Sequence, residues 1–146
     1  KNALQGYTPA LNSHFERFET FGLNKVFIAD RALGNGATLQ HEFGHFFTLQ
    51  HTYGNSPVEG TTDELPDGSN CLTAGDFICD TPPDPNGQLD CCTCEYIGTI
   101  NPSHIVFDPL VNNFMSYYKY CCKNAFTPGQ LAAMRKAAIL YRNYLK

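Results

Sequence analysis

The chain has 146 residues, 42% hydrophobic and 13% aromatic, which is enough for one globular domain with a buried core. A net charge of only −4 argues against nucleic acid as a partner, and no apolar run approaches the length of a membrane span. Because the chain begins with Lys1, we expect a mature form or a fragment of a longer precursor.

The first forty residues predict two short elements. Residues 10–20 are expected to form a helix with apolar side chains on one face. Residues 26–29 form an apolar run that predicts a strand. The glycine-rich run 34–36 then interrupts regular structure, and a helix is expected to begin near Thr38.

Residues 41–51, HEFGHFFTLQH, predict a catalytic zinc site. His41 and His45 are four residues apart, so on a helix both imidazoles lie on one face, one turn apart. Glu42 is rotated from His41 by about 100°, so it can reach a metal-bound water without ligating the metal. His51 comes six residues after His45, far enough for the chain to leave the helix and bring a third imidazole back to the first two. Three protein ligands leave the open position that a catalytic zinc needs.

The alternative is a core helix with incidental histidines. Apolar residues of the core-helix type support part of that interpretation: Leu39, Phe43, Phe46 and Phe47. We expect them to lie opposite His41 and His45, so that one side of the helix packs and the other binds metal.

The middle of the chain is acidic, because no Lys or Arg occurs between Arg31 and Lys119. Its carboxylates are those of Glu42, Glu59, Asp63, Glu64, Asp67, Asp76, Asp80, Asp84, Asp90, Glu95 and Asp108. A cation, with calcium the best match for carboxylate oxygens, would relieve their repulsion. From the residues alone, a solvated acidic surface is the simpler interpretation.

Seven cysteines gather in the second half of the chain: Cys71, Cys79, Cys91, Cys92, Cys94, Cys121 and Cys122. In an oxidising compartment they would cross-link this loop-rich region, which predicts a secreted or periplasmic protein. Cys91 and Cys94 also form a C-x-x-C, but no second pair or histidine is spaced to complete a structural zinc site. The odd number leaves at least one thiol free or intermolecular.

The last predicted element is a well-marked helix. Thr127 is its expected N-cap, Pro128 lies in the first turn and Gln130 completes a capping box. Phe126 and Leu131 are placed to form a hydrophobic staple. One face is expected to pack against the protein: Leu131, Met134, Ala138, Tyr141 and Leu145.

Four segments in order resemble a known group. The 41–51 motif resembles the extended zinc motif HExxHxxGxxH of the metzincin metallopeptidases, and residues 113–117, Asn-Phe-Met-Ser-Tyr, resemble their Met-turn. Residues 75–82 and 126–130 resemble segments of the pappalysin, or cytophagalysin-like, branch.

The resemblance implies a single α+β catalytic domain over residues 1–146. Its upper lobe, about residues 1–51, would hold a small sheet and the zinc helix. Its lower lobe, about residues 52–146, would be loop-rich, disulfide-stapled and closed by a helix. Met115 would form an apolar floor beneath the histidines. Tyr117 would bind the metal at rest or hydrogen-bond the developing oxyanion.

The resemblance also implies calcium around Asp76, Asp80 and Thr81. By analogy, residues 32–37 would form the edge that binds extended peptide substrate. The family's disulfides would pair two sets of cysteines: Cys71 with Cys94, and Cys91 or Cys92 with Cys121 or Cys122.

Two features depart from the family pattern. Thr48 replaces the glycine that turns the chain out of the helix, often with a positive φ that a β-branched residue resists. Either the turn is made differently, or a carboxylate, Glu59 or Glu64, is the third ligand in place of His51. We prefer His51 as the third ligand. Only forty residues precede the helix, so we expect the strands of the family's upper lobe that line the substrate cleft to be missing or much reduced.

We therefore expect a secreted zinc endopeptidase that acts on peptides or proteins, with Glu42 as general base. The alternatives are an inactive, metal-stabilised binding module and a truncated peptidase domain. A deformylase-like metalloamidase would need a separate cysteine ligand and leaves the Met-turn unexplained. The sequence carries no prediction of oligomeric state.

Overall fold

The computed structural model describes residues 6–7, 26–54, 60–86, 88–89, 93–98 and 106–145. Within these ranges the chain forms the helices α1 (Thr38–Phe46) and α2 (Pro128–Tyr141). It also forms three short 3-10 helices: η1 (Asp30–Asn35), η2 (Tyr120–Cys122) and η3 (Asn143–Leu145). The helix predicted over 10–20 lies outside the described residues, and α1 begins where the sequence predicts it.

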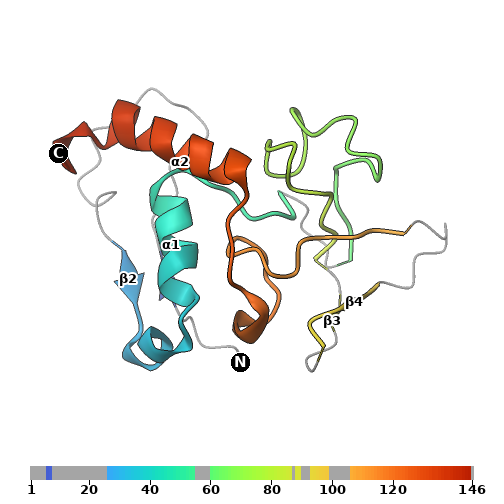
Figure 1. Ribbon diagram of the computed structural model, residues 1–146, viewed down its shortest axis with the longest axis horizontal. Coiled ribbons are helices and arrows are strands. Elements are labelled where there is room, and N and C mark those ends of the chain that lie inside the picture. The colour runs from blue at the N-terminus through green and yellow to red at the C-terminus, as the bar shows by residue number, and fades with distance from the viewer. Residues whose placement is uncertain are drawn as a thin grey trace.

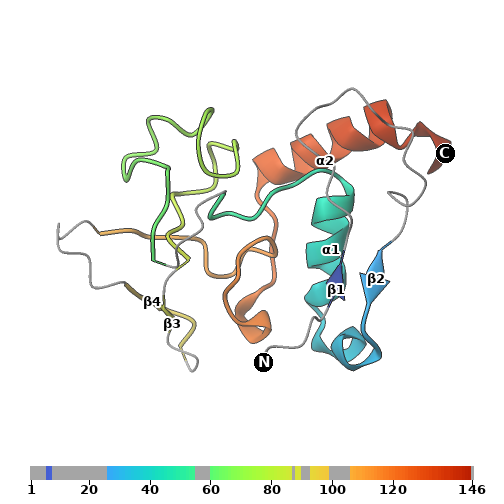
Figure 2. The ribbon, with the colours of Figure 1, turned by 180° about the vertical axis from the view of Figure 1, so that it is seen from behind.

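The described strands form two small antiparallel pairs. β1 (Gly6–Tyr7) pairs with β2 (Phe27–Ile28), which confirms the strand predicted over 26–29. β3 (Gln88–Leu89) pairs with β4 (Tyr96–Gly98) in the loop-rich half. Figure 2 shows β1 and β2 beside α1, which contacts both strands and η1.

η1 contradicts one expectation about substrate binding. The family analogy makes residues 32–37 the edge that binds extended peptide substrate, but residues 32–35 belong to the 3-10 helix η1 (Asp30–Asn35). Its backbone groups are turned towards hydrogen bonds of the helical kind, such as that from Ala32 N–H to Ala29 O at 2.7 Å. A peptide therefore cannot pair with this segment as it would with a strand.

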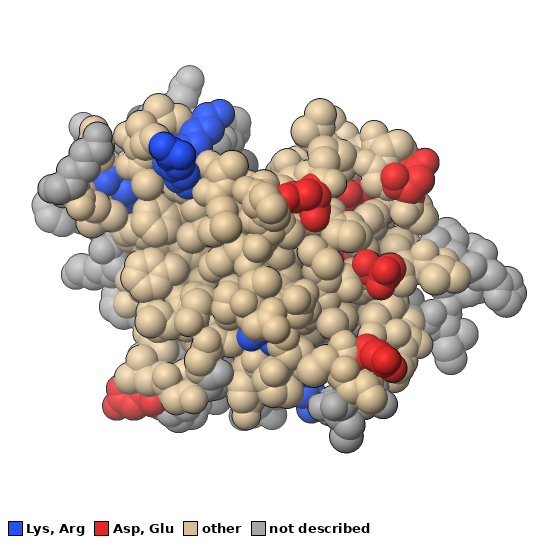
Figure 3. Space-filling view, in the orientation of Figure 1, with Lys and Arg blue, Asp and Glu red and all other residues tan. Residues whose placement is uncertain are grey.

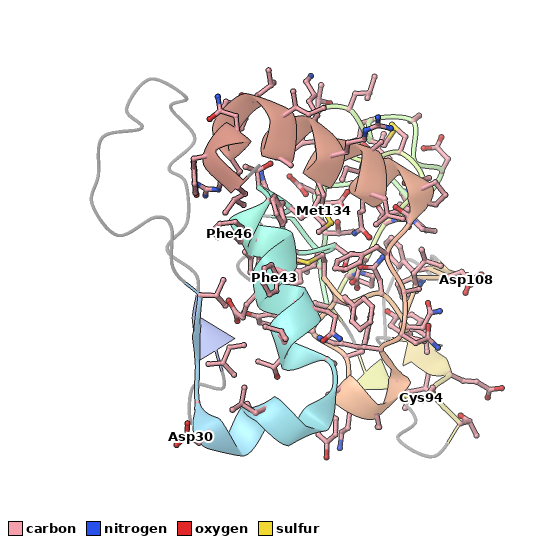
Figure 4. The ribbon with its side chains drawn as sticks, turned by 60° about the vertical axis from the view of Figure 1, so that its left-hand side comes forward. Asp30, Phe43, Phe46, Cys94, Asp108 and Met134 are labelled. Atoms are coloured by element: carbon pink, nitrogen blue, oxygen red, sulfur yellow. A yellow bond between two sulfur atoms is a disulfide. The ribbon has the colours of Figure 1, made fainter. Side chains whose placement is uncertain are left out.

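α2 lies across the C-terminal end of α1 (Figure 1), and Arg142 joins the two helices. The Arg142 guanidinium donates to the Phe46 carbonyl oxygen through Nε at 3.3 Å and Nη2 at 3.2 Å. It also lies 4.3 Å from the centre of the Phe46 ring. A cation at the C-terminus of a helix is favourable, so this buried arginine anchors the end of the histidine-bearing helix. Figure 4 shows Met134 on the side of α2 that faces this junction.

The capping box of α2 is present as predicted. Thr127 Oγ1 accepts from Gln130 N–H at 3.1 Å, and Gln130 Oε1 accepts from Thr127 N–H at 3.0 Å. The predicted packing face is wrong for Leu131 and Leu145, which are more than half exposed. Gln130 and Ala137 are buried instead, because a hydrogen bond between the Gln130 side chain and Asn113 sets the rotation of the helix.

The predicted apolar face of α1 is also only partly packed. Phe46 is buried, but Leu39 is 44% exposed and Phe43 is 41% exposed. These two residues are four positions apart and therefore lie on the same side of the helix, one turn apart. The expectation that all four apolar residues lie in the core is therefore wrong for Leu39 and Phe43.

Two disulfides lie in the described part of the chain, Cys71–Cys79 and Cys94–Cys122. The predicted pairing of Cys71 with Cys94 is wrong, because turns within residues 71–79 bring the Cα atoms of Cys71 and Cys79 to 5.0 Å. Since Cys94 is in a disulfide, the C-x-x-C is not a zinc site. The predicted pairing of Cys91 or Cys92 with Cys121 or Cys122 is also wrong, because Cys122 is bonded to Cys94 and Cys121 is a free, exposed thiol. Cys91 and Cys92 lie outside the described residues.

Charge is divided between the two sides of the molecule. In Figure 3 the basic side chains gather mainly over α2 and the acidic side chains mainly over the loop-rich side. This division follows from the sequence, because the segment between Arg31 and Lys119 contains eleven carboxylates and no Lys or Arg. No helix among the described residues has the length and apolar character needed to cross a membrane.

Candidate metal centre

The chain leaves α1 through a Schellman motif that places Thr48 in the left-handed region. Leu49 N–H donates to Gly44 O at 2.9 Å, and Thr48 N–H donates to His45 O at 2.9 Å. This is the helix end that usually requires glycine, and Thr48 adopts it with φ 73°. Thr48 therefore makes the same kind of turn that a glycine would make, at a cost in backbone strain.

The turn brings His51 back to His41 and His45. His45 Nε2 lies 3.2 Å from His41 Nε2 and 2.9 Å from His51 Nε2. One nitrogen from each ring lies within 4.8 Å of the other two. Nitrogens bound to one tetrahedral zinc lie about 3.3 Å apart, so the three imidazoles have the spacing of ligands that share an ion.

Hydrogen bonds at the far side of the rings decide which nitrogens face one another. His41 Nδ1 lies 2.7 Å from Phe114 O, and His45 Nδ1 lies 2.8 Å from Leu49 O. A carbonyl oxygen only accepts, so each Nδ1 carries the proton and each Nε2 of a neutral ring presents a lone pair. Facing lone pairs repel unless a cation lies between them, so the three histidines could hold a metal ion.

The surroundings also keep the imidazoles of His41 and His51 neutral. Burial first, and then the charges of His45 and Lys123, lower the pKa of His41 to about 3, although the bond to Phe114 opposes this shift. Burial, followed by the charges of His45, His41 and Lys123, lowers the pKa of His51 to about 2. Neutral rings retain the lone pair that a metal requires.

Met115 lies beside the helix that carries the first two histidines. Its side chain is 0% exposed, and a Cβ at Gly44 would overlap its sulfur. Gly44 therefore allows the 113–117 turn to approach α1 at the level of the imidazoles. The neighbouring Phe114 carbonyl is the acceptor that orients His41.

A buried amide pair joins this turn to α2. Asn113 Nδ2 donates to Gln130 Oε1 at 2.7 Å, and Gln130 Nε2 donates back to Asn113 Oδ1 at 3.1 Å. Asn113 Oδ1 also accepts from Met115 N–H at 2.8 Å. Because Gln130 at the same time closes the capping box with Thr127, the Met-turn-like segment and the helix N-terminus form one hydrogen-bonded unit. Residue spacing gave no signal for this pairing.

Tyr117 belongs to an aromatic group at the histidines. Its ring centre lies 4.4 Å from that of His51 and 6.0 Å from that of His41, and the residue is 57% exposed. Tyr53, which the sequence did not single out, stacks on His51 with ring centres 4.9 Å apart and planes inclined by 14°. Burial, and then the charge of Tyr117 and a hydrogen bond with it, raise the pKa of Tyr53 well above its usual range.

Asp84 is a second residue that sequence reasoning missed. Its buried carboxylate accepts from Thr52 Oγ1 and, at 2.7 Å, from the Tyr118 hydroxyl. It therefore joins the residue after His51 to the residue after Tyr117. Nearby, Lys123 donates to the Ser116 carbonyl, and burial lowers its pKa to about 8 against the opposing charge of Asp84. Asp84 and Lys123 belong to no sequence motif, so their positions along the chain did not indicate a role at the site.

The remaining metal-site residues are placed as follows. Glu42 is buried on α1 directly after His41. Glu64 is not part of the histidine cluster, which in the described residues consists of His41, His45 and His51. Glu59, the other alternative ligand, lies outside the described residues.

The residues expected to bind calcium separate into two environments. Asp80 caps α2, because its Oδ1 accepts from Thr127 Oγ1 at 2.8 Å and its Oδ2 from Gly129 N–H at 2.7 Å. Thr81 Oγ1 donates to Asp76 Oδ1 at 2.7 Å. Asp76 Oδ2 and Glu64 Oε1 are buried and receive no hydrogen bond. Burial raises the pKa of Asp76 to about 6, and burial followed by the charges of Asp76 and Asp63 raises that of Glu64 to about 7.

Comparisons with known proteins agree with this geometry. The chain is 33% identical over 105 residues to pappalysin-1 of Homo sapiens, covering 69% of this chain and 6% of the relative. It is 36% identical over 106 residues to an extracellular metalloprotease of Verticillium alfalfae, covering 70% of this chain and 30% of the relative. The chain thus spans less than a third of each of these relatives.

A solved structure of mature mirolysin from Tannerella forsythia, in complex with a cleaved peptide, matches with a TM-score of 0.56 and 25% identity. The match covers 99% of this chain and 55% of that chain. The model of the M43 peptidase family, described as that of pregnancy-associated plasma protein-A, matches residues 16–139. With the histidine cluster and the buried methionine in place, these matches show that the chain belongs to the M43 peptidase family.

Proposed function

We propose that this protein is a zinc-dependent endopeptidase whose metal ligands are His41, His45 and His51. The observation that carries the proposal is the convergence of three Nε2 atoms, with the Nδ1 atoms of His41 and His45 held by carbonyl oxygens. Zinc bound there would lower the pKa of a water to about 7 and polarise the scissile carbonyl.

The protein's own residues would then move protons and stabilise charge. Glu42 accepts the proton of the attacking water as general base and delivers it to the leaving amine. Tyr117, which lies against His51 and is exposed, donates a hydrogen bond to the oxygen on which negative charge develops. Met115 and Gly44 keep the helix and the turn at a constant separation, so the imidazoles retain their geometry.

A peptide substrate and a secreted location are supported by the relatives and by the disulfides. Mirolysin, the structural neighbour, was solved with a cleaved peptide, and the fungal relative is named an extracellular metalloprotease. Two disulfides in the described residues are typical of proteins that fold in an oxidising compartment. We therefore propose that the chain cleaves peptides outside the cell.

We also propose a calcium site at Glu64 and Asp76. The support is that one oxygen of each carboxylate is buried and receives no hydrogen bond, an arrangement that costs free energy unless a cation compensates. Thr81 holds the other oxygen of Asp76 through its hydroxyl. Asp80 is the weaker candidate, since its oxygens already cap α2.

The test is digestion of a mixed peptide library, read by mass spectrometry, with the wild type and Glu42→Gln. The wild type should cleave, and the variant should lose at least about a thousandfold in kcat while keeping one zinc per chain, because Gln cannot accept the water's proton. Glu95→Gln, a change of the same kind at an exposed position, is the matched control. Cleavage by Glu42→Gln at the wild-type rate would refute the general-base role. Zinc retention without cleavage by the wild type would instead favour an inactive binding module.

A further inference from the structure

Tyr53 lies two residues after His51 and belongs to a group of three rings with Tyr117. The ring centres of Tyr53 and His51 are 4.9 Å apart, those of His51 and Tyr117 are 4.4 Å apart, and those of Tyr53 and Tyr117 are 5.0 Å apart. A side-chain hydrogen bond with Tyr117 is also among the causes that raise the pKa of Tyr53, and a tyrosine side chain can form such a bond only through its hydroxyl group. Each ring therefore contacts the other two.

We propose that Tyr53 is a positioning residue for Tyr117: its hydroxyl donates to the Tyr117 oxygen and directs the Tyr117 proton towards the substrate. This role rests on the proposed peptidase function. It adds a second phenol to the site, one that acts through Tyr117 and does not itself contact the reacting atoms.

The direction of the hydrogen bond follows from burial. Tyr53 is partly buried with its ring stacked on His51, whereas Tyr117 is 57% exposed. A hydroxyl on a partly buried side chain has less access to water than one on an exposed side chain, so it loses more free energy when it fails to donate within the protein. Tyr53 therefore supplies the proton of the shared bond, and the oxygen of Tyr117 accepts it.

This direction has a consequence for chemistry. The Tyr117 oxygen uses one lone pair to accept from Tyr53, so its own proton points away from Tyr53 and remains available to an incoming oxyanion. Hydrogen bonds in a chain also polarise one another, so accepting from Tyr53 makes Tyr117 a better donor. A preorganised donor of this kind lowers the barrier because it needs no reorientation during the reaction.

The backbone around Tyr53 is held against the 113–117 turn. Thr52 N–H donates to Met115 O at 3.3 Å, and the Thr52 hydroxyl donates to Asp84. Asp84 in turn accepts from Tyr118, the neighbour of Tyr117. Tyr53 and Tyr117 therefore lie on two segments that are joined to each other, which maintains the contact between the two hydroxyl groups.

The test is a double-mutant cycle with Tyr53→Phe and Tyr117→Phe, each of which removes a hydroxyl and keeps the ring. Tyr53→Phe should lower kcat about fivefold to tenfold with little change in KM or zinc content, because one hydrogen bond to the donor is lost. Tyr117→Phe should lower kcat by about a hundredfold. The double variant should match Tyr117→Phe alone, because Tyr53 acts only through Tyr117. Tyr120→Phe, at an exposed tyrosine of η2, is the matched control.

A second readout does not depend on catalysis. In the zinc-free protein, urea unfolding of the wild type, the two single variants and the double variant should show non-additive losses of stability, since Tyr53→Phe and Tyr117→Phe break the same hydrogen bond. Wild-type kcat in Tyr53→Phe, multiplicative losses in the double variant, or additive stabilities would each overturn the positioning role in an active peptidase. A wild type that cleaves no peptide would overturn the proposed function, and the positioning role with it, even if the hydroxyls prove coupled in stability.

Discussion

Thr48→Gly should stabilise the folded protein, although the substitution removes a side chain. Thr48 has φ 73° in the turn that ends α1. The left-handed conformation costs an L-residue about 1–2 kcal/mol because its Cβ approaches the carbonyl oxygen. Glycine has no Cβ and avoids this cost, but its greater freedom in the unfolded chain destabilises the fold by about 0.5–1 kcal/mol. The difference predicts a net gain of about 0.5–1 kcal/mol.

The gain should be measured by urea and thermal unfolding at a fixed zinc concentration, since zinc that binds only the folded state adds its own stability. For a chain of this size, the melting temperature should rise by about 1–4 °C. Thr48→Ala is the matched control, because it removes the hydroxyl and the branch but keeps the Cβ. We expect Thr48→Ala to be no more stable than the wild type.

Zinc affinity provides a second check on the same reasoning. The left-handed turn already places Leu49 O at 2.8 Å from His45 Nδ1, so relief of strain should leave the affinity of Thr48→Gly within about threefold of the wild type. A Thr48→Gly variant that is less stable than Thr48→Ala would refute the assignment of strain to this turn. A large loss of zinc affinity would show that the threonine side chain supports the metal site in another way.

Two further predictions concern the metal sites. His51→Ala should weaken zinc binding at least a hundredfold in competition with a chromophoric chelator, and an unchanged affinity would point to a different third ligand. For Glu64 and Asp76, whose folded pKa values of about 7 and 6 exceed those of the unfolded chain, the contribution to stability is fully present below about pH 4 and is lost as the pH rises through 6 to 7. Calcium binds the ionised carboxylates, so it should raise the melting temperature clearly at pH 8 and little at pH 5. Glu64→Gln should reduce the rise that calcium causes at pH 8. An equal rise in melting temperature at both pH values would contradict the calcium site.

Several features of this protein followed from the sequence because they depend on backbone geometry within one element. Four residues along a helix return to the same face, so the spacing of His41 and His45 is sufficient to place their imidazoles together. The capping box at Thr127 and Gln130 is equally local, and it is present as predicted. Family resemblance identified the 113–117 turn, and Met115 is buried beside Gly44 on the histidine-bearing helix.

Other features depend on how distant segments pack, and local pattern carries little information about that. The disulfide partner of Cys94 is Cys122, twenty-eight positions away. The buried face of α2 begins with the polar residue Gln130, whose amide hydrogen-bonds to Asn113 seventeen positions away. Apolar periodicity counts hydrophobic side chains, so it cannot recognise a polar residue that is buried because its hydrogen bonds are satisfied.

The turn at Thr48 depends both on local backbone preference and on contacts between distant segments. Its side chain disfavours the left-handed conformation, so local preference alone predicts a different turn or a different third ligand. In the folded protein the Leu49 carbonyl bonds to His45, and Thr52 N–H and Thr52 Oγ1 bond to Met115 and Asp84. These contacts on both sides of the turn hold Thr48 in a strained conformation, because their combined free energy exceeds the cost at one residue. The sequence by itself determined which side chains could ligate a metal, and only the tertiary structure decided that the third histidine reaches the other two.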